Sequence, residues 1–333
     1  MSAVLSAPDD EAAAAPPPAL RPDAEWFIVM NQGSGASEKD EVRRAIEAEL
    51  MGAARRHRFV PVAPGAIVQA CQEAARLAAE HGGILVAAGG DGTINCAAQA
   101  ALAHACPLGV IAQGTFNLFA RELGLPLDAG EATRALLHAQ AQPEPVQVGW
   151  VNQRVFLVNA SVGLYPKLLV DREAAKHKLG RRRWIAMLSA LKSLLEWRLQ
   201  LLLDAEVDGE LRQLRTASVF LCNNRVQLQR IGIADEIVQQ VGQGKLACLM
   251  VPPLGLWAKL RMMVAAVFSR LGADREVLSL PLRTLSVGSR HARRLKVATD
   301  GEVQWMQLPL RFTVAPRPLR VMLPPPGERL PPE

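Results

Sequence analysis

The motif best suited to chemistry is Gly89-Gly90-Asp91-Gly92-Thr93, which lies between an apolar run and a segment with a helical pattern. Three glycines leave the backbone amides of this turn uncovered, and such amides at the start of a helix bind anions such as phosphate. Asp91 adds a carboxylate that can hold the magnesium ion of a polyphosphate. The motif therefore predicts a nucleotide-phosphate site with Asp91 as a metal ligand, although a plain glycine-rich turn has the same composition.

Two further glycine-bearing loops follow apolar runs in the same way. They are Asn31-Gln32-Gly33-Ser34-Gly35 and Gly114-Thr115-Phe116-Asn117. Loops at the carboxyl ends of neighbouring strands in an open parallel sheet converge on one crevice. All three loops can therefore face the same ligand, although each of these two, taken alone, is more often a simple turn.

A distant acidic motif, Asp300-Gly301-Glu302, lies between two strand-like runs near the end of the chain. Asp-Gly is a common hairpin turn, and this is the usual interpretation of such a motif in isolation. The same tripeptide occurs at Asp208-Gly209-Glu210, which shows how readily it arises by chance.

The segments that must hold the first three loops alternate between strand and helix patterns. Short apolar runs, as buried parallel strands require, occur at residues 26–30, 59–62, 84–88 and 108–111. Helical patterns separate them at residues 38–51, 65–81 and 93–104. The alternation predicts a layered α/β domain over residues 25–143, after a disordered tail over residues 1–24.

After Pro143 and Pro145 the pattern changes to strands joined directly by turns, which is typical of antiparallel pairing. The expected strands are residues 146–150, 155–160, 199–207, 211–222, 245–251, 277–287, 295–299 and 308–314. They predict an all-β sandwich or barrel over residues 144–315 with two inserted helices. The proline-rich residues 316–333 are expected to form an extended C-terminal segment.

Taken together, the motifs resemble the diacylglycerol kinase catalytic family, to which bacterial lipid kinases and sphingosine kinases belong. The resemblance rests on Gly89-Gly90-Asp91-Gly92-Thr93 with Asn95, Pro107-Leu108-Gly109-Val110-Ile111, Gly114-Thr115-Phe116-Asn117 with Phe119-Ala120-Arg121, Asn159, Gly163 and Asp300-Gly301-Glu302. It extends over about residues 26–314. The ordered combination is far more specific than any one motif.

The resemblance implies an ATP-dependent lipid kinase whose α/β domain is similar to those of NAD kinases and phosphofructokinases and whose second domain is a β sandwich. ATP and Mg²⁺ are implied to bind in the cleft between the domains. The residues implied to contact the nucleotide are Asn31, Gly33, Ser34, Gly35, Gly89, Gly90, Asp91, Gly92, Thr93, Asn95, Gly114, Thr115 and Asn117.

The catalytic set implied by the family is Glu302, Asp300 and Asp91. A carboxylate within hydrogen-bond reach can take the proton of an alcohol as its oxygen attacks the γ-phosphate, so Glu302 is the candidate base. Asp300 is expected to act beside it on the acceptor hydroxyl, and Asp91 to hold the metal.

Several positions depart from the family pattern. Gln32 stands where the family usually has Pro, Cys96 where it usually has Glu, and Leu118 where Asp commonly follows the Asn. Residues 225–245 also differ, so a structural metal site found there in some bacterial members is left out of the prediction.

The composition favours acidic partners. The 333 residues carry a formal net charge of +6, which suits nucleotides or anionic lipid headgroups. Five scattered cysteines with no Cys-x-x-Cys motif indicate neither a disulfide framework nor a zinc site and fit a reducing cytoplasm. Because no apolar run approaches the roughly 18 residues that span a bilayer, we expect a cytoplasmic protein that contacts the membrane peripherally.

A basic run at residues 176–183 leads into an amphipathic pattern at residues 184–195, and a second apolar stripe lies at residues 257–271. Either helix could dock on anionic headgroups or face the core. A lipid substrate is thus expected, and a homodimer is left open.

Two alternatives remain at the level of sequence. NAD kinases share the Gly-Gly-Asp-Gly-Thr loop, so an NAD kinase is the alternative enzyme. The departures at Cys96 and Leu118 also suit a catalytically silent protein that binds nucleotide or lipid. A nucleic-acid partner is not expected, because basic residues are not interleaved with stacking aromatics.

Overall fold

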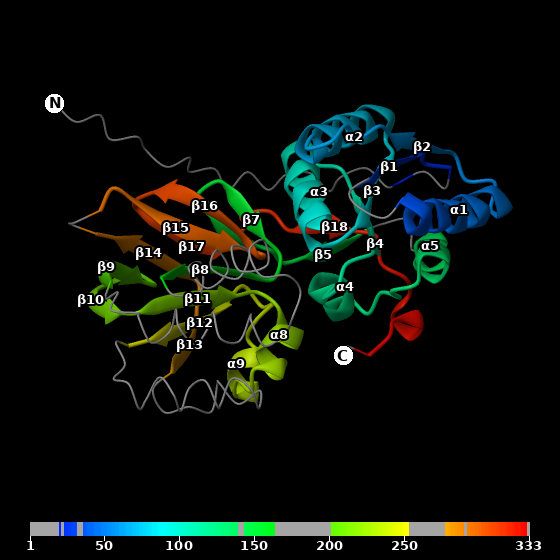
Figure 1. Cartoon of the computed structure of the whole chain (residues 1–333). Coiled ribbons are helices and arrows are strands. Elements are labelled where there is room, and N and C mark those ends of the chain that lie inside the picture. Colours follow the sequence, from blue (N-terminus) through cyan, green and yellow to red (C-terminus); the bar gives the residue numbers. More distant parts are fainter. Residues whose placement is uncertain are drawn as a thin grey trace.

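A computed structural model describes Leu20 and residues 23–31, 36–138, 143–163, 201–252, 277–289 and 292–331. A layered α/β domain and an antiparallel β domain lie side by side, and β7 faces α3 where the two meet (Figure 1). The predicted fold class is confirmed. The two helices expected around residues 184–195 and 257–271 lie outside the described residues.

The first sheet has the strand order β2-β1-β3-β4-β18-β5. Its strands are β1 Trp26–Met30, β2 His57–Val60, β3 Ile84–Gly89, β4 Leu108–Ala112, β5 Glu144–Val146 and β18 Leu319–Val321. The first four run parallel, so their carboxyl ends lie at one edge of the sheet. The predicted loops that follow β3 and β4 lie at this end of the strands.

Helices cover both faces of this sheet. They are α1 Ala36–Gly52, α2 Ile67–His81, α3 Asp91–His104, α4 Leu118–Glu122 and α5 Ala129–Leu137. Alanines of α2 and α3, such as Ala74 and Ala97, pack with Phe27 on one face. Ile46 of α1 and Leu136 of α5 pack on the other. Because alanine side chains are short, α3 lies close to the strand that it follows, and its N-terminus is held at the sheet edge.

The C-terminal segment differs from the extended tail that its prolines predicted. Leu319 and Val321 are buried, and β18 pairs parallel with β4 and antiparallel with β5. Alternating apolar residues between Pro318 and Pro324 are long enough for a three-residue strand, so the prolines flank the pairing and do not prevent it. Strand β5, expected at the start of the second domain, is likewise part of the first sheet.

The second domain packs two six-stranded sheets, of orders β10-β9-β14-β17-β6-β7 and β13-β12-β11-β8-β15-β16. The strands are β6 Gly149–Val151, β7 Arg154–Phe156, β8 Asn159–Gly163, β9 Leu201–Val207, β10 Glu210–Thr216, β11 Ser218–Cys222, β12 Leu246–Val251, β13 Leu278–Leu282, β14 Thr284–Gly288, β15 Arg294–Thr299, β16 Glu302–Gln307 and β17 Leu310–Val314. Phe156, Val219, Leu285 and Phe312 belong to the core between them. Its short helices are α8 Arg225–Arg230 and α9 Asp235–Val238, and a short 3-10 helix, η2 Pro326–Glu328, lies in the C-terminal segment beyond this domain.

Three strands expected as single runs are each divided between the two sheets of the second domain. Residues 155–160 fall in β7 and β8, with a break at Leu157 and Val158. Residues 211–222 form β10 and β11 with a break at Ala217, and residues 277–287 form β13 and β14 with a break at Arg283. Each break lets the chain cross from one sheet to the other without a long loop. Within the described residues, no helix combines the length and hydropathy that a membrane crossing requires.

Candidate active site

The two glycine loops that follow β3 and β4 touch each other. Gly89 and Ala112 are neighbours in the sheet, and the Gln113 amide donates to the Gly89 carbonyl at 2.8 Å. A Cβ placed on Gly114 would lie 3.0 Å from the Gly90 Cα and 2.7 Å from the Asn117 Oδ1. Glycine is therefore required at position 114 for this approach, and the predicted convergence of these two loops is present in the fold.

Asn117 fixes the shape of the second loop. Its backbone is left-handed, with φ 51°. The side chain accepts from the Gly114 amide at 2.8 Å and donates to the Gly114 carbonyl at 2.9 Å. The backbone amide of Asn117 donates to the Asp91 carboxylate at 3.2 Å. Asn117 thus holds the loop and its neighbour together, and its side chain is already occupied within the protein.

Asp91 begins α3, whose N-terminus has no side-chain cap. Its Oδ2 is the acceptor for Asn117, whereas Oδ1 is buried without a hydrogen-bond partner. Burial raises the pKa of Asp91, and backbone amides, Asn117 foremost, oppose the rise. An uncapped helix start with an unsatisfied carboxylate oxygen is an arrangement that an anion and its cation can complete together.

The threonines of the two loops differ in exposure. Thr93 is buried, and a Cβ on Gly89 would lie 2.9 Å from its Oγ1, so this side chain packs against the end of β3. Thr115 is exposed, as is its neighbour Phe116, whose side chain is 55% accessible. The exposed pair is free to meet a ligand, while Thr93 supports the loop from below.

Asp300 joins the two domains through its carboxyl group. The backbone amides of Leu157, Val158 and Asn159 donate to it at 2.7, 2.9 and 2.9 Å. The Asn95 side chain of α3 donates to it at 2.7 Å and to the Val155 carbonyl at 3.2 Å. Burial raises the pKa of Asp300, and these hydrogen bonds oppose the rise. The hydrogen bond between Asn95 and Asp300 therefore connects α3 of the first domain to the β15–β16 turn of the second.

Glu302 begins β16 and reaches over the N-terminal turn of α3. A Cβ on Gly92 would lie 3.4 Å from the Glu302 Oε1. The other carboxylate oxygen forms an ion pair with the Arg154 Nη2 at 3.0 Å, and the Glu302 side chain remains 58% exposed. Residues 210 positions apart in the sequence thus meet where the two domains face each other.

Comparison with known proteins identifies a family that resembles part of the chain. The diacylglycerol kinase catalytic domain family matches residues 25–151, the stretch that holds both glycine loops and Asp91. The similarity to that family is limited to this region of the chain.

Relatives with curated names also match a part of this chain. A protein of Serratia proteamaculans named a probable lipid kinase, YegS-like, is 34% identical over 148 residues, which are 43% of this chain and 46% of the relative. A diacylglycerol kinase of Bacillus subtilis is 40% identical over 91 residues, 26% of this chain and 29% of the relative. These matches therefore cover less than half the length of the relatives.

The solved structure of a diacylglycerol kinase from Bacillus anthracis has the same fold, with a TM-score of 0.65. The alignment covers 90% of this chain and 97% of that structure, at 19% identity. Identity this low shows the fold alone. The structural alignment extends the similarity of fold from residues 25–151 into the β domain.

One departure from the diacylglycerol kinase pattern lies directly at the site. Cys96 stands where the family usually has Glu. It is partly exposed, and its thiol interacts electrostatically with both Glu302 and Arg154. Burial raises the pKa of its thiol, Glu302 raises it further, and Arg154 opposes the rise. The thiol and guanidinium thus occupy space beside the candidate base that sequence reasoning had left undescribed.

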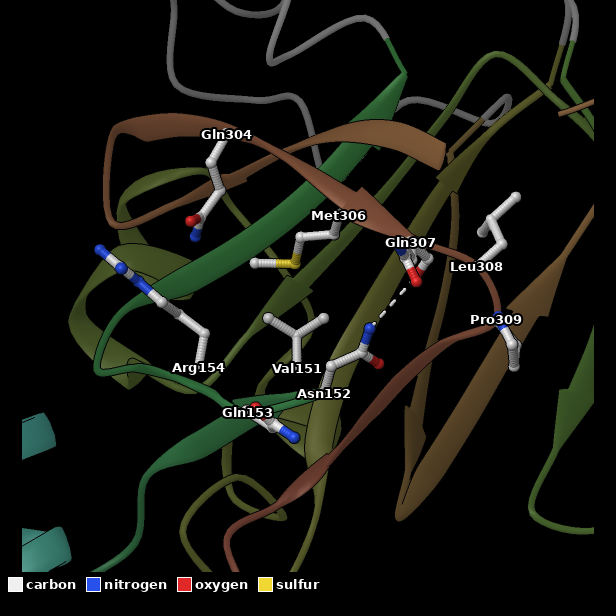
Figure 2. Close-up of a pocket in the computed structure, with 9 residues that line it drawn as sticks. All are labelled: Val151, Asn152, Gln153, Arg154, Gln304, Met306, Gln307, Leu308 and Pro309. Atoms are coloured by element: carbon white, nitrogen blue, oxygen red, sulfur yellow. Dashed lines mark hydrogen bonds between the residues drawn. The ribbon is translucent and has the colours of Figure 1, made fainter. Parts of the chain in front are cut away.

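A hollow of about 630 Å³ begins beside this ion pair and follows the facing edges of the two β sheets. Figure 2 shows Arg154 and Gln304 pointing toward each other across it, with Met306 and Val151 between the strands. Asn152 and Gln307 lie farther along, joined by a hydrogen bond of 3.2 Å from the Asn152 side chain to the Gln307 carbonyl. The hollow combines an apolar floor with polar walls.

A second contact between the domains was missed from the sequence. Glu122 of α4 accepts from the Arg225 backbone amide at 3.1 Å and from its side chain at 3.0 Å. Burial raises the pKa of Glu122, and Arg225 opposes the rise. Arg154 was missed as well. Neither carried a local signal, because single charged residues near turns are ordinary on protein surfaces.

The first loop is only partly described. Asn31 follows β1 and is exposed, whereas Gln32, Gly33, Ser34 and Gly35 lie outside the described residues. The predicted roles of Asn31, Gly33, Ser34 and Gly35 stay predictions. Residues 225–245 contain α8 and α9, and no group of three metal-ligating side chains occurs in the described part of the chain.

Proposed function

We propose that the protein is an ATP-dependent lipid kinase that transfers the γ-phosphate of ATP to a lipid hydroxyl. The observation that carries the proposal is the position of Glu302 over the first turn of α3, next to Gly92. The candidate base belongs to one domain and the candidate phosphate site to the other, and a Cβ on Gly92 would lie 3.4 Å from the Glu302 Oε1. Phosphoryl transfer requires little more than such alignment and charge neutralisation.

The triphosphate of ATP would lie against the uncapped start of α3 and the paired glycine loops. The close approach of Gly90 and Gly114 leaves no Cβ between that backbone and a phosphate. Mg²⁺ commonly uses one or two carboxylates with water and substrate phosphates, so the unpartnered Oδ1 of Asp91 suits it. When bound there, the ion would neutralise phosphate charge.

The acceptor hydroxyl would lie between Glu302 and the γ-phosphate. Glu302 takes the hydroxyl proton as the acceptor oxygen bonds to the γ-phosphorus and the bond to the β-phosphate oxygen breaks, which releases ADP. Arg154 orients the carboxylate through its ion pair. Asp300 and Asn95 act as positioning residues, since their hydrogen bonds fix the hairpin turn against α3. The hollow beyond Arg154 offers room for the polar part of the lipid.

The experiment is incubation of the purified protein with ATP, Mg²⁺ and a total lipid extract, followed by mass spectrometry of the lipids. A lipid that gains one phosphate group in the presence of the wild type, and not of Glu302→Gln, is the expected result. A second incubation, with NAD in place of the lipid extract, tests the alternative that the protein is an NAD kinase, since NAD kinases share the Gly-Gly-Asp-Gly-Thr loop. A new phosphate on NAD and on no lipid would overturn the lipid assignment.

A protein that binds ATP without turnover of any acceptor would be a silent nucleotide sensor. Cys96 beside Glu302 is the observation that favours this second function, because a thiol takes the place of a carboxylate usual in the family. Cys96→Glu separates the two readings. Turnover that appears only in this variant would show that the natural chain retains the binding site and lacks a group needed for transfer.

A further inference from the structure

An exposed tryptophan lies between two cations on the β15–β16 hairpin. The Trp305 side chain is 56% accessible. The guanidinium carbon of Arg294 lies 4.9 Å from the centre of its ring, and the Nζ of Lys296, its cross-strand neighbour, lies 5.5 Å away. We call these three side chains the Trp305 patch.

The patch faces away from the core of the sandwich. Leu295 and Met306, which alternate with its members along the two strands, pack against the interior cluster. Successive side chains on a strand point to opposite faces, so Lys296 and Trp305 point outward. Strand β16 is also the last strand of its sheet, so nothing in that sheet pairs beyond it.

The stretch of chain that carries the patch has more basic than acidic side chains. The basic side chains described between residues 277 and 309 are Arg283, Arg293, Arg294 and Lys296, and the acidic ones are Asp300 and Glu302. Hydrogen bonds enclose the first acid, and Arg154 pairs with the second. Within the described chain, neither Arg294 nor Lys296 has an ion-pair partner, so their charge is not neutralised locally.

A hollow of about 660 Å³ adjoins the patch. Arg293 and Arg294 line one side, and Gln307 and Pro309 line another. Two guanidinium groups at one hollow suit a phosphate, because each guanidinium offers donors in a planar fork that matches phosphate oxygens.

We propose that the Trp305 patch is the surface by which the protein docks on an anionic phospholipid bilayer. An indole flanked by cations suits the headgroup region, where the ring is partly buried and the cations meet lipid phosphates. Trp305 is three residues beyond Glu302 on one strand, or about 10 Å. The odd spacing puts the two side chains on opposite faces of the strand, so docking there would bring the turn that carries the candidate base near the bilayer while the Glu302 carboxylate faces Gly92. The choice of a bilayer as the partner rests on the proposed lipid acceptor.

The test is sedimentation of the full chain with vesicles in the absence of ATP. Phosphatidylcholine vesicles are compared with phosphatidylcholine vesicles that contain phosphatidylserine. We expect binding to the anionic vesicles, weakened about fivefold by Lys296→Gln and about 25-fold by Arg294→Gln with Lys296→Gln, since each basic residue near an anionic surface contributes on the order of 1 kcal/mol. Trp305→Ala is expected to weaken binding about fivefold or more.

Matched controls lie on the same domain. Leu211→Ala removes another exposed apolar side chain, and Arg311→Gln another exposed cation, and both should bind like the wild type. Hydrogen exchange should show vesicle-dependent protection in peptides of β15 and β16. Wild-type binding that survives Trp305→Ala and the double variant would overturn the proposal. Assembly of two chains through β16, detected by a concentration-dependent mass that Trp305→Ala abolishes, would also overturn it.

Turnover assays distinguish a failure of the docking surface from a failure of the proposed kinase function. Trp305→Ala should retain turnover of a short-chain acceptor dispersed without vesicles and lose turnover of the same headgroup in a bilayer. A wild type that binds anionic vesicles without any turnover would keep the docking surface and remove the kinase assignment.

Discussion

The same tripeptide, Asp-Gly-Glu, closes two hairpins of the β domain with the same backbone. Asp208 and Asp300 have φ values of 46° and 47°, and Gly209 and Gly301 both have φ 91°. Their surroundings differ completely. Asp208 is exposed and accepts from the Arg283 and Thr284 amides at 2.8 Å. Asp300 is held by the facing loop and by the other domain. Local sequence therefore specifies the turn, and the tertiary neighbours specify what the turn can do.

The largest expected difference is catalytic. Glu302→Gln should lower turnover by about 10²- to 10⁴-fold, because it removes the candidate general base while keeping the shape of the side chain. Glu210→Gln alters the matching position in the other turn and should leave turnover unchanged. Steady-state phosphorylation of the lipid identified by mass spectrometry measures both. Equal turnover in the two variants would place the base elsewhere.

The next difference concerns stability. Asp300→Ala would leave buried amide donors of residues 157–159 and the Asn95 side chain without an acceptor, at a cost of about 3–5 kcal/mol of unfolding free energy. Asp208→Ala exposes its two amide donors to water and should cost about 1 kcal/mol. Urea unfolding measures both. A comparable loss for the two variants would show that the Asp300 contacts contribute no more than a surface turn.

Substitution of the glycine in either turn should lower the unfolding free energy by the same amount. Gly209→Ala and Gly301→Ala both force a side chain into the left-handed region, and a Cβ at either position meets no atom within 4 Å. The strain is therefore local, and each variant should lose about 1–2 kcal/mol of unfolding free energy. Thermal unfolding of the pair tests this. A much larger loss for Gly301→Ala would mean that the Asp300 contacts are sensitive to small shifts of the turn.

This comparison also explains what the sequence could and could not predict. The alternation of strand and helix patterns around Gly89 and Gly114 predicted that the two loops meet, because the loops that follow neighbouring parallel strands lie at the same end of the sheet. The pairing of Glu302 with Arg154 involves a surface charge after an ordinary turn, which has no local pattern. Strand β18 was missed for a related reason, since three apolar residues among prolines form a strand only when a neighbouring edge, here β4, accepts them.

The smallest expected effect is a change in the alkylation rate of Cys96, which lies beside Glu302 of the Asp300 turn. The other four cysteines are buried, so alkylation of the native chain should start at Cys96. The thiolate is the reactive form, and burial and Glu302 raise the pKa of this thiol above its usual 9.0, so the rate should keep rising with pH beyond 9. ATP with Mg²⁺ should slow the reaction by a few-fold, because a nucleotide against the start of α3 would cover the approach to the thiol. Leu211→Cys places a second thiol beside the Asp208 turn, where nucleotide should give no protection. Mass spectrometry of labelled peptides reads both sites in one sample, and equal slowing at the two would mean that the nucleotide acts on the whole fold and not at the turn that meets α3.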